Sequence, residues 1–164
     1  LALLPEIPGV RALAQRVFMV DEFLIRRPDY GQTPIETLRA GLADPGYDRG
    51  VLLHGHCYQK TQPPADDGLP SGQQASLALL KALDYEVELV DSGCCGMAGS
   101  FGYESEHYEL SMQIGELALF PAVRAAAEGQ QVLASGVSCR AQIASGTGRA
   151  AKHPIELIAE RLSV

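Results

Sequence analysis

The stretch Gly50-Val51-Leu52-Leu53-His54 is a short apolar run, and Gly55-His56-Cys57 follows it directly. A run of this length and composition is typical of a β-strand. Cys57 therefore lies just beyond the carboxyl end of a predicted strand, and the rest of the chain repeats this arrangement.

Two further strands lead into cysteines. Residues 85–90 (YEVELV) precede Asp91-Ser92-Gly93-Cys94-Cys95, and residues 131–135 (QVLAS) precede Cys139. Helical patterns cover residues 73–83 and 104–128, and we expect Pro121 to interrupt the second. Strands that alternate with helices predict an α/β fold with a mainly parallel sheet flanked by helices. Binding sites in such sheets lie outside the carboxyl ends of the strands, where all the cysteines are placed.

The remaining segments complete one domain. Residues 8–27 have apolar residues near helical spacing and predict a helix, residues 28–33 a turn, residues 34–42 a second helix and residues 44–48 a loop. Residues 59–72 contain three prolines among acidic and small residues and predict an exposed loop. We therefore expect a single domain, with a helical segment over residues 1–46 and an α/β core over residues 47–164.

Composition limits the classes of function. The chain has 164 residues, of which 46% are hydrophobic and 20% charged, enough for one compact core. A net charge of -7 and a pI near 5.0 argue against a nucleic-acid partner. Neither a signal peptide nor a membrane-spanning segment is evident, and the sequence begins at Leu1, so it is interpreted as a piece of a longer protein. The cysteine content fits a reducing cytoplasm better than a disulfide-stapled secreted domain.

The chain has four cysteines, and two of them are adjacent in the run DSGCCGMAG. Thiolates select zinc, Cu(I) and iron-sulfur centres over hard cations. No pair has the Cys-x2-4-Cys spacing of a zinc knuckle, which makes zinc the second choice. Neighbouring cysteines tend to point apart and would reach two irons more easily than one small ion. The pattern therefore favours a polynuclear cluster with Cys57, Cys94, Cys95 and Cys139 as ligands.

Other residues near the cysteines could support a bound group. Gly96 and Gly99 would let backbone N–H groups approach sulfur closely, and such hydrogen bonds tune cluster potential. His54 and His56 could donate to sulfur, and on a continuing strand they would share the face opposite to Cys57. Arg140 follows Cys139 at a predicted helix start and could balance a negative cluster.

Three runs resemble a known family. They are HGHCYQK at residues 54–60, GCCGMAGSFG at residues 93–102 and GVSCR at residues 136–140. They are similar to the cysteine-rich CCG domain found in heterodisulfide reductase, in the iron-sulfur protein of glycolate oxidase and in FAD-linked 2-hydroxy-acid oxidases. The last group is the most similar, because its members also carry a stretch like residues 3–24. The family pattern often ends in Cys-x-x-Cys, whereas this chain has Gly136 in place of the first of those cysteines.

The resemblance implies an electron-transfer role. Five thiolates hold the non-cubane cluster of the heterodisulfide enzyme, whereas the four of this chain suit an ordinary 4Fe-4S cluster. The parent protein would oxidise a D-2-hydroxy acid, such as lactate, glycolate or 2-hydroxyglutarate, at an FAD bound elsewhere. Electrons would pass from flavin and ferredoxin-like domains of the parent chain, through this domain, to an electron carrier or a quinone. The location would be cytoplasmic, with the inner face of the membrane as an option.

This chain supplies no site for the substrate reaction itself. It has no Gly-x-Gly-x-x-Gly run after a strand for a flavin or nicotinamide, and no recognised nucleophile pattern, so we assign no catalytic residue. Two alternatives remain open for the cysteines. One is a structural zinc module that uses some of them, with or without His56. The other is a thiol-disulfide redox domain that uses the Cys94-Cys95 pair.

Overall fold

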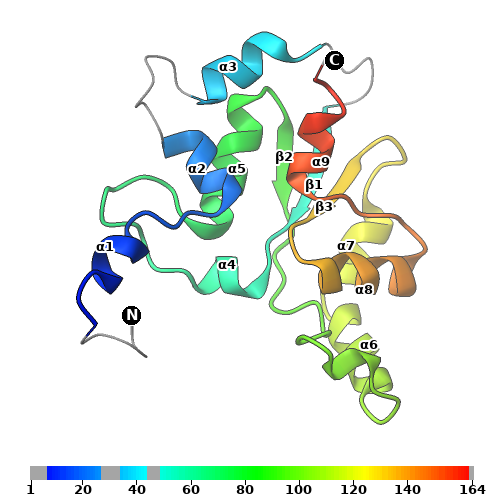
Figure 1. Ribbon diagram of the computed structural model, residues 1–164. Coiled ribbons are helices and arrows are strands. Elements are labelled where there is room, and N and C mark those ends of the chain that lie inside the picture. Colours follow the sequence, from blue (N-terminus) through cyan, green and yellow to red (C-terminus); the bar gives the residue numbers. More distant parts are fainter. Residues whose placement is uncertain (1–6, 27–33, 44–48, 163–164) are drawn as a thin grey trace.

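A three-stranded parallel sheet forms the centre of the molecule (Figure 1). The computed structural model describes residues 7–26, 34–43 and 49–162. β1 (Gly50–His54) pairs in parallel with β2 (Glu86–Leu89) on one side and with β3 (Gln131–Ala134) on the other. The three predicted strands and the α/β class are thereby confirmed.

β1 is the central strand, and its side chains point alternately to two cores. Leu52 packs with residues of α7 (Leu119–Ala125) and α8 (Val137–Thr147) on one face of the sheet. Val51 and Leu53 pack with α5 (Gly72–Ala82) and α9 (Pro154–Ala159) on the other face. Both faces of a parallel strand are buried in this way, which explains the uninterrupted apolar run in the sequence.

The segment between β2 and β3 contains two helices, where one long helix was predicted. A 3-10 turn, η1 (Phe101–Tyr103), precedes α6 (Tyr108–Glu116), and α7 starts after a break at Leu117 and Ala118. The predicted interruption exists, but it lies before Pro121. A proline cannot donate an N–H to the carbonyl four residues earlier, and its ring clashes with that carbonyl. Pro121 is instead accommodated in the first turn of α7, where an N–H is not needed.

The predicted helix over residues 8–27 was wrong as a single element. The chain forms α1 (Val10–Ala14) and α2 (Val20–Arg26), with a break between them. The Glu22 carboxylate accepts a hydrogen bond of 3.1 Å from the Met19 N–H, which is the half of a capping box that starts a new helix. α3 (Pro34–Gly41) matches the second predicted helix. The turn expected at 28–33 and the loop expected at 44–48 lie outside the described residues.

Two buried acids attach α2 to the core. Asp21 accepts hydrogen bonds from the hydroxyl of Ser76, on α5, and from the amide of Gln59, the latter at 3.3 Å. Glu22 accepts the Gly72 N–H at 2.9 Å and so satisfies the first turn of α5. Gln59 itself is only 6% exposed, because it belongs to α4 (Cys57–Thr61). The exposed loop predicted to begin at Gln59 therefore begins only after that helix.

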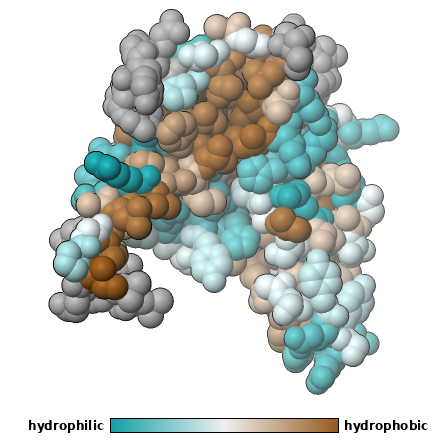
Figure 2. Space-filling model, viewed as in Figure 1, coloured by the Kyte–Doolittle hydropathy of each residue, from teal (hydrophilic) through white to brown (hydrophobic). Residues whose placement is uncertain are grey.

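Apolar side chains also remain on the surface. Figure 2 shows them gathered over the part of the molecule that contains α2, α3, α5 and α9, and again at α1, whereas the part with α6 is largely polar. Exposed large side chains near the amino end include Leu13, Val17 and Met19. Among the helices of the described residues, none has the length and apolar character needed to cross a bilayer.

The two-sided burial of β1 predicts the cost of shortening one of its side chains. Leu53→Ala truncates a side chain that is 0% exposed, and we expect it to lower the free energy of unfolding by about 2–5 kcal/mol. Leu117→Ala is the matched control, since Leu117 is 82% exposed and should change stability by less than about 0.5 kcal/mol. Urea unfolding followed by circular dichroism measures both. Equal effects would contradict the assignment of Leu53 to the core.

Candidate functional site

All four cysteines line one cavity of about 410 Å³ at the carboxyl edge of the sheet. Cys57 is the first residue of α4, Cys94 and Cys95 lie in the loop after β2, and Cys139 is the third residue of α8. All are free thiols. The cavity is completed by residues from the same three segments: His56, Tyr58, Ala98, Gly99 and Ser138. Three chain segments thus bring four sulfur donors around one space.

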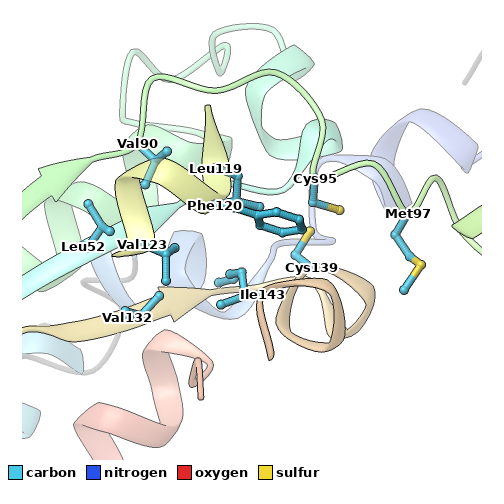
Figure 3. Close-up of a cluster of buried hydrophobic side chains, with 11 residues drawn as sticks. Leu52, Val90, Cys95, Met97, Leu119, Phe120, Val123, Val132, Cys139 and Ile143 are labelled. Atoms are coloured by element: carbon cyan, nitrogen blue, oxygen red, sulfur yellow. The ribbon is translucent and has the colours of Figure 1, made fainter. Parts of the chain in front are cut away.

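The four thiols differ in burial. Cys95 and Cys139 are 4% and 2% exposed, and they belong to the same core as Leu52 and Phe120. Figure 3 shows their sulfur atoms next to each other beside the Phe120 ring, while Met97 points away from them. Cys57 and Cys94 are half-buried. The cavity therefore has an inner side made by one pair of cysteines and an outer side made by the other pair.

His54 joins the inner pair. Its ring is 1% exposed, and one of its nitrogens and the sulfurs of Cys95 and Cys139 all lie within 4.8 Å of one another. The sequence suggests that His54 and His56 share a strand face opposite to Cys57. That expectation was wrong, because β1 ends at His54 and α4 begins three residues later.

The inner cysteines form a coupled pair. A hydrogen bond from the Cys139 thiol is the largest of several interactions that lower the pKa of Cys95 to about 4, and His54 and the Met97 amide act in the same direction against the effect of burial. The Cys95 sulfur and burial both raise the pKa of Cys139. The two thiols share one proton, which stays on Cys139 and leaves Cys95 as a thiolate, the form that binds metals.

His56 has a structural role at the entrance to α4. Its Nδ1 accepts the Tyr58 N–H at 3.2 Å, and its own N–H donates to the Gln59 side chain at 3.1 Å, which together form a capping box. The ring stacks on Tyr58, with 5.4 Å between centroids. It also lies 3.8 Å from the Cys57 sulfur, measured at Nδ1.

Gly136 makes room for the His56 ring. A Cβ at position 136 would lie 2.5 Å from the His56 Cδ2 and 3.0 Å from the Cys139 sulfur. Any side chain there would require the imidazole to move. A fifth cysteine at this position would thus compete with His56 for space at the cavity.

The other predicted supporting residues take different places. The Gly96 N–H donates to the Cys94 sulfur at 3.3 Å. Gly99 lines the cavity, and its φ of 74° lies in the left-handed region. Arg140 donates from Nη1 to the carbonyl oxygens of Ala134 and Ser135, at 2.9 Å each, so it holds the end of β3.

Lys60 is a charged neighbour of the site that the cysteine pattern does not single out. Its Nζ donates to the carbonyl oxygens of Ser92 and Gly93, just before the cysteine pair. Burial lowers the pKa of Lys60, and the nearby thiols of Cys139, Cys57 and Cys94 counter that effect together with Asp91. A signal was available in the sequence, since Lys60 follows Cys57 by three residues and helical residues three apart share a face.

Known proteins provide an independent comparison. The chain is 35% identical to one subunit, the third by its letter, of the anaerobic glycerol-3-phosphate dehydrogenase of Escherichia coli strain K12, over 97% of this chain and 36% of that protein. It is 36% identical to the D-2-hydroxyglutarate dehydrogenase of the same strain, over 65% of this chain and 10% of that enzyme. The corresponding enzyme of Pantoea ananatis is 35% identical over 66% of this chain and 10% of its own length.

The chain is therefore similar to parts of larger dehydrogenase proteins. It spans 10% of the 2-hydroxyglutarate dehydrogenases and 36% of the glycerol-3-phosphate dehydrogenase protein, so these relatives contain much that lies outside the similarity. No family model matches the chain. No solved structure matches it significantly.

Two glycines of the cysteine loop provide a test of its backbone geometry. Gly96 has a φ of 99°, and a Cβ there would overlap the Ser111 carbonyl oxygen, whereas Gly99 faces open space. We expect Gly99→Ala to cost only the strain of a left-handed residue, about 1 kcal/mol. Gly96→Ala should cost at least about 1–3 kcal/mol more, because the backbone must also shift. Equal unfolding midpoints in urea for the two variants would contradict the close approach of Gly96 to Ser111.

Proposed function

We propose that this chain is a cysteine-rich domain of the CCG type, in which Cys57, Cys94, Cys95 and Cys139 ligate one 4Fe-4S cluster. The observation that carries the proposal is the single cavity lined by all four thiols. Four cysteines are also the number that such a cluster takes.

The donor set fits the group. The ligand atoms are soft sulfurs, which suit iron-sulfur centres and not hard cations. One of the inner thiols is held as a thiolate, and the Gly96 N–H is directed at the Cys94 sulfur. When bound, an iron-sulfur cluster transfers single electrons and so connects two-electron flavin chemistry with one-electron carriers.

The comparisons support a role inside a larger dehydrogenase. We infer that the parent protein oxidises a D-2-hydroxy acid at an FAD outside these residues, as the name of the 2-hydroxyglutarate dehydrogenases suggests. Flavin and ferredoxin-like domains of the parent would be the electron donors, and a quinone or a soluble carrier the acceptor. The reaction would take place in the cytoplasm, including the inner surface of the membrane.

Anaerobic reconstitution with iron and sulfide tests the cluster. We expect about four irons and four sulfides per chain and an EPR signal after reduction. A protein that remains folded, free of iron and without an EPR signal would overturn the proposal. Circular dichroism before and after the treatment establishes that the fold is intact.

Single Cys→Ser variants test the ligand set. Because each of the four thiols lines the cavity, each substitution should reduce the iron content or alter the EPR spectrum of the reconstituted protein. Ser100→Ala is the control, since Ser100 is an exposed serine in the neighbouring segment and should leave both unchanged. A cysteine whose replacement changes neither quantity would be removed from the ligand set.

A mononuclear zinc site is the second candidate, favoured by the close approach of His54, Cys95 and Cys139. It makes a different prediction for the outer cysteine Cys57. If zinc is bound by the inner group, Cys57→Ser should retain zinc at near wild-type stoichiometry, whereas a four-thiolate cluster should be lost or altered. Metal analysis of the purified variant, with His54→Gln for comparison, separates the two candidates.

A further inference from the structure

A short chain of polar side chains leads from the surface to the buried His54. The Nδ1 of His54 lies 3.0 Å from the Ser92 hydroxyl oxygen, and the Lys60 Nζ lies 3.3 Å from the same oxygen. The three residues come from β1, the loop after β2, and α4. They meet directly behind the inner cysteines, with which His54 is in contact range.

The donors and acceptors along this chain fix the state of the histidine. A lysine ammonium has only donors, so the Ser92 oxygen must accept from Lys60. The Ser92 hydrogen is then available to donate, and the His54 Nδ1 is its partner in the described part of the chain. A neutral imidazole whose Nδ1 accepts a hydrogen bond carries its proton on Nε2.

We propose that Lys60 and Ser92 hold His54 in the Nε2–H tautomer, so that the imidazole donates a hydrogen bond to the Cys95 sulfur and does not offer a lone pair to a metal. Lys60 and Ser92 are positioning residues in this scheme, because they act through His54. The opposite tautomer would donate from Nδ1 to Ser92 and leave the serine hydrogen without an acceptor among residues 7–26, 34–43 and 49–162.

The inference deepens the proposed function and rests on it only for its consequence. A histidine that donates to a ligand sulfur leaves all four metal positions to thiolates, which is the donor set of the proposed cluster. The lowered pKa of Cys95 is in agreement, since His54 is one of the groups that lower it. The tautomer, however, is a property of this chain with or without a cluster.

Nitrogen-15 NMR of the reduced, metal-free protein measures the tautomer directly. The chain has only four histidines, so long-range proton–nitrogen correlations resolve them, and the signals absent from His54→Gln identify His54. We expect a protonated Nε2 and an unprotonated Nδ1. A spectrum with the proton on Nδ1, or on both nitrogens, at neutral pH would overturn the inference without bearing on the cluster.

Three variants test the role of the serine. Ser92→Ala removes the donor to Nδ1, and we expect a loss of the single tautomer in favour of a mixture. Ser92→Thr retains the hydroxyl and should restore the wild-type spectrum, which a purely structural role would not require. Ser100→Ala is the matched control. An unchanged His54 spectrum in Ser92→Ala, in a protein that folds, would show that Ser92 does not fix the tautomer.

Reconstitution separates this inference from the proposed function. In the cluster-loaded protein, Ser92→Ala should lower the midpoint potential relative to wild type, because a hydrogen bond to a ligand sulfur is weakened. An equal potential in the two proteins would refute the donor role of His54. A wild-type chain that takes up no cluster would count against the proposed function, whereas the NMR result on the tautomer would remain valid.

Discussion

The parallel pairing of β1 with both of its neighbours is the constraint on which the site depends. Parallel strands end at the same edge of a sheet, so the segments that follow β1, β2 and β3 leave the core side by side. Each of these segments carries cysteine, although the residues are up to 82 positions apart in sequence. An antiparallel neighbour would have sent one of the three segments to the opposite edge. Strand direction alone thus assembles the four thiols.

Burial then divides the cavity into two chemically different halves. Cys95 and Cys139 extend the hydrophobic core and are shielded from water, whereas Cys57 and Cys94 lie nearer the surface. Polar groups compensate for this at the inner side, where a thiolate at Cys95 has the Cys139 thiol and His54 as partners. On the outer side, Lys60 fixes the carbonyl groups that precede Cys94. The same loop is therefore held from both directions.

The strands, their direction and the placement of the cysteines could be predicted because each depends on local pattern and on a general rule of α/β sheets. The break before α2 could not, since it depends on Glu22, whose carboxylate meets the Met19 N–H only in the folded chain. The pattern places Gln59 in a loop because prolines follow it closely, yet its contact with Asp21 makes it internal. Lys60 and Ser92 escape prediction for a related reason. Polar residues carry no periodic signal, and these two partners are 32 residues apart along the chain.

The anchoring of α2 has a consequence for how small this domain can be. Asp21 and Glu22 are 5% and 4% exposed, and they provide the acceptors for groups on α4 and α5. A shortened chain beginning at β1 would leave the Ser76 hydroxyl and the Gly72 N–H facing an empty surface. The sheet and its cysteines form the visible centre of the fold, but the minimal unit that can bury its own polar groups extends back at least to α2.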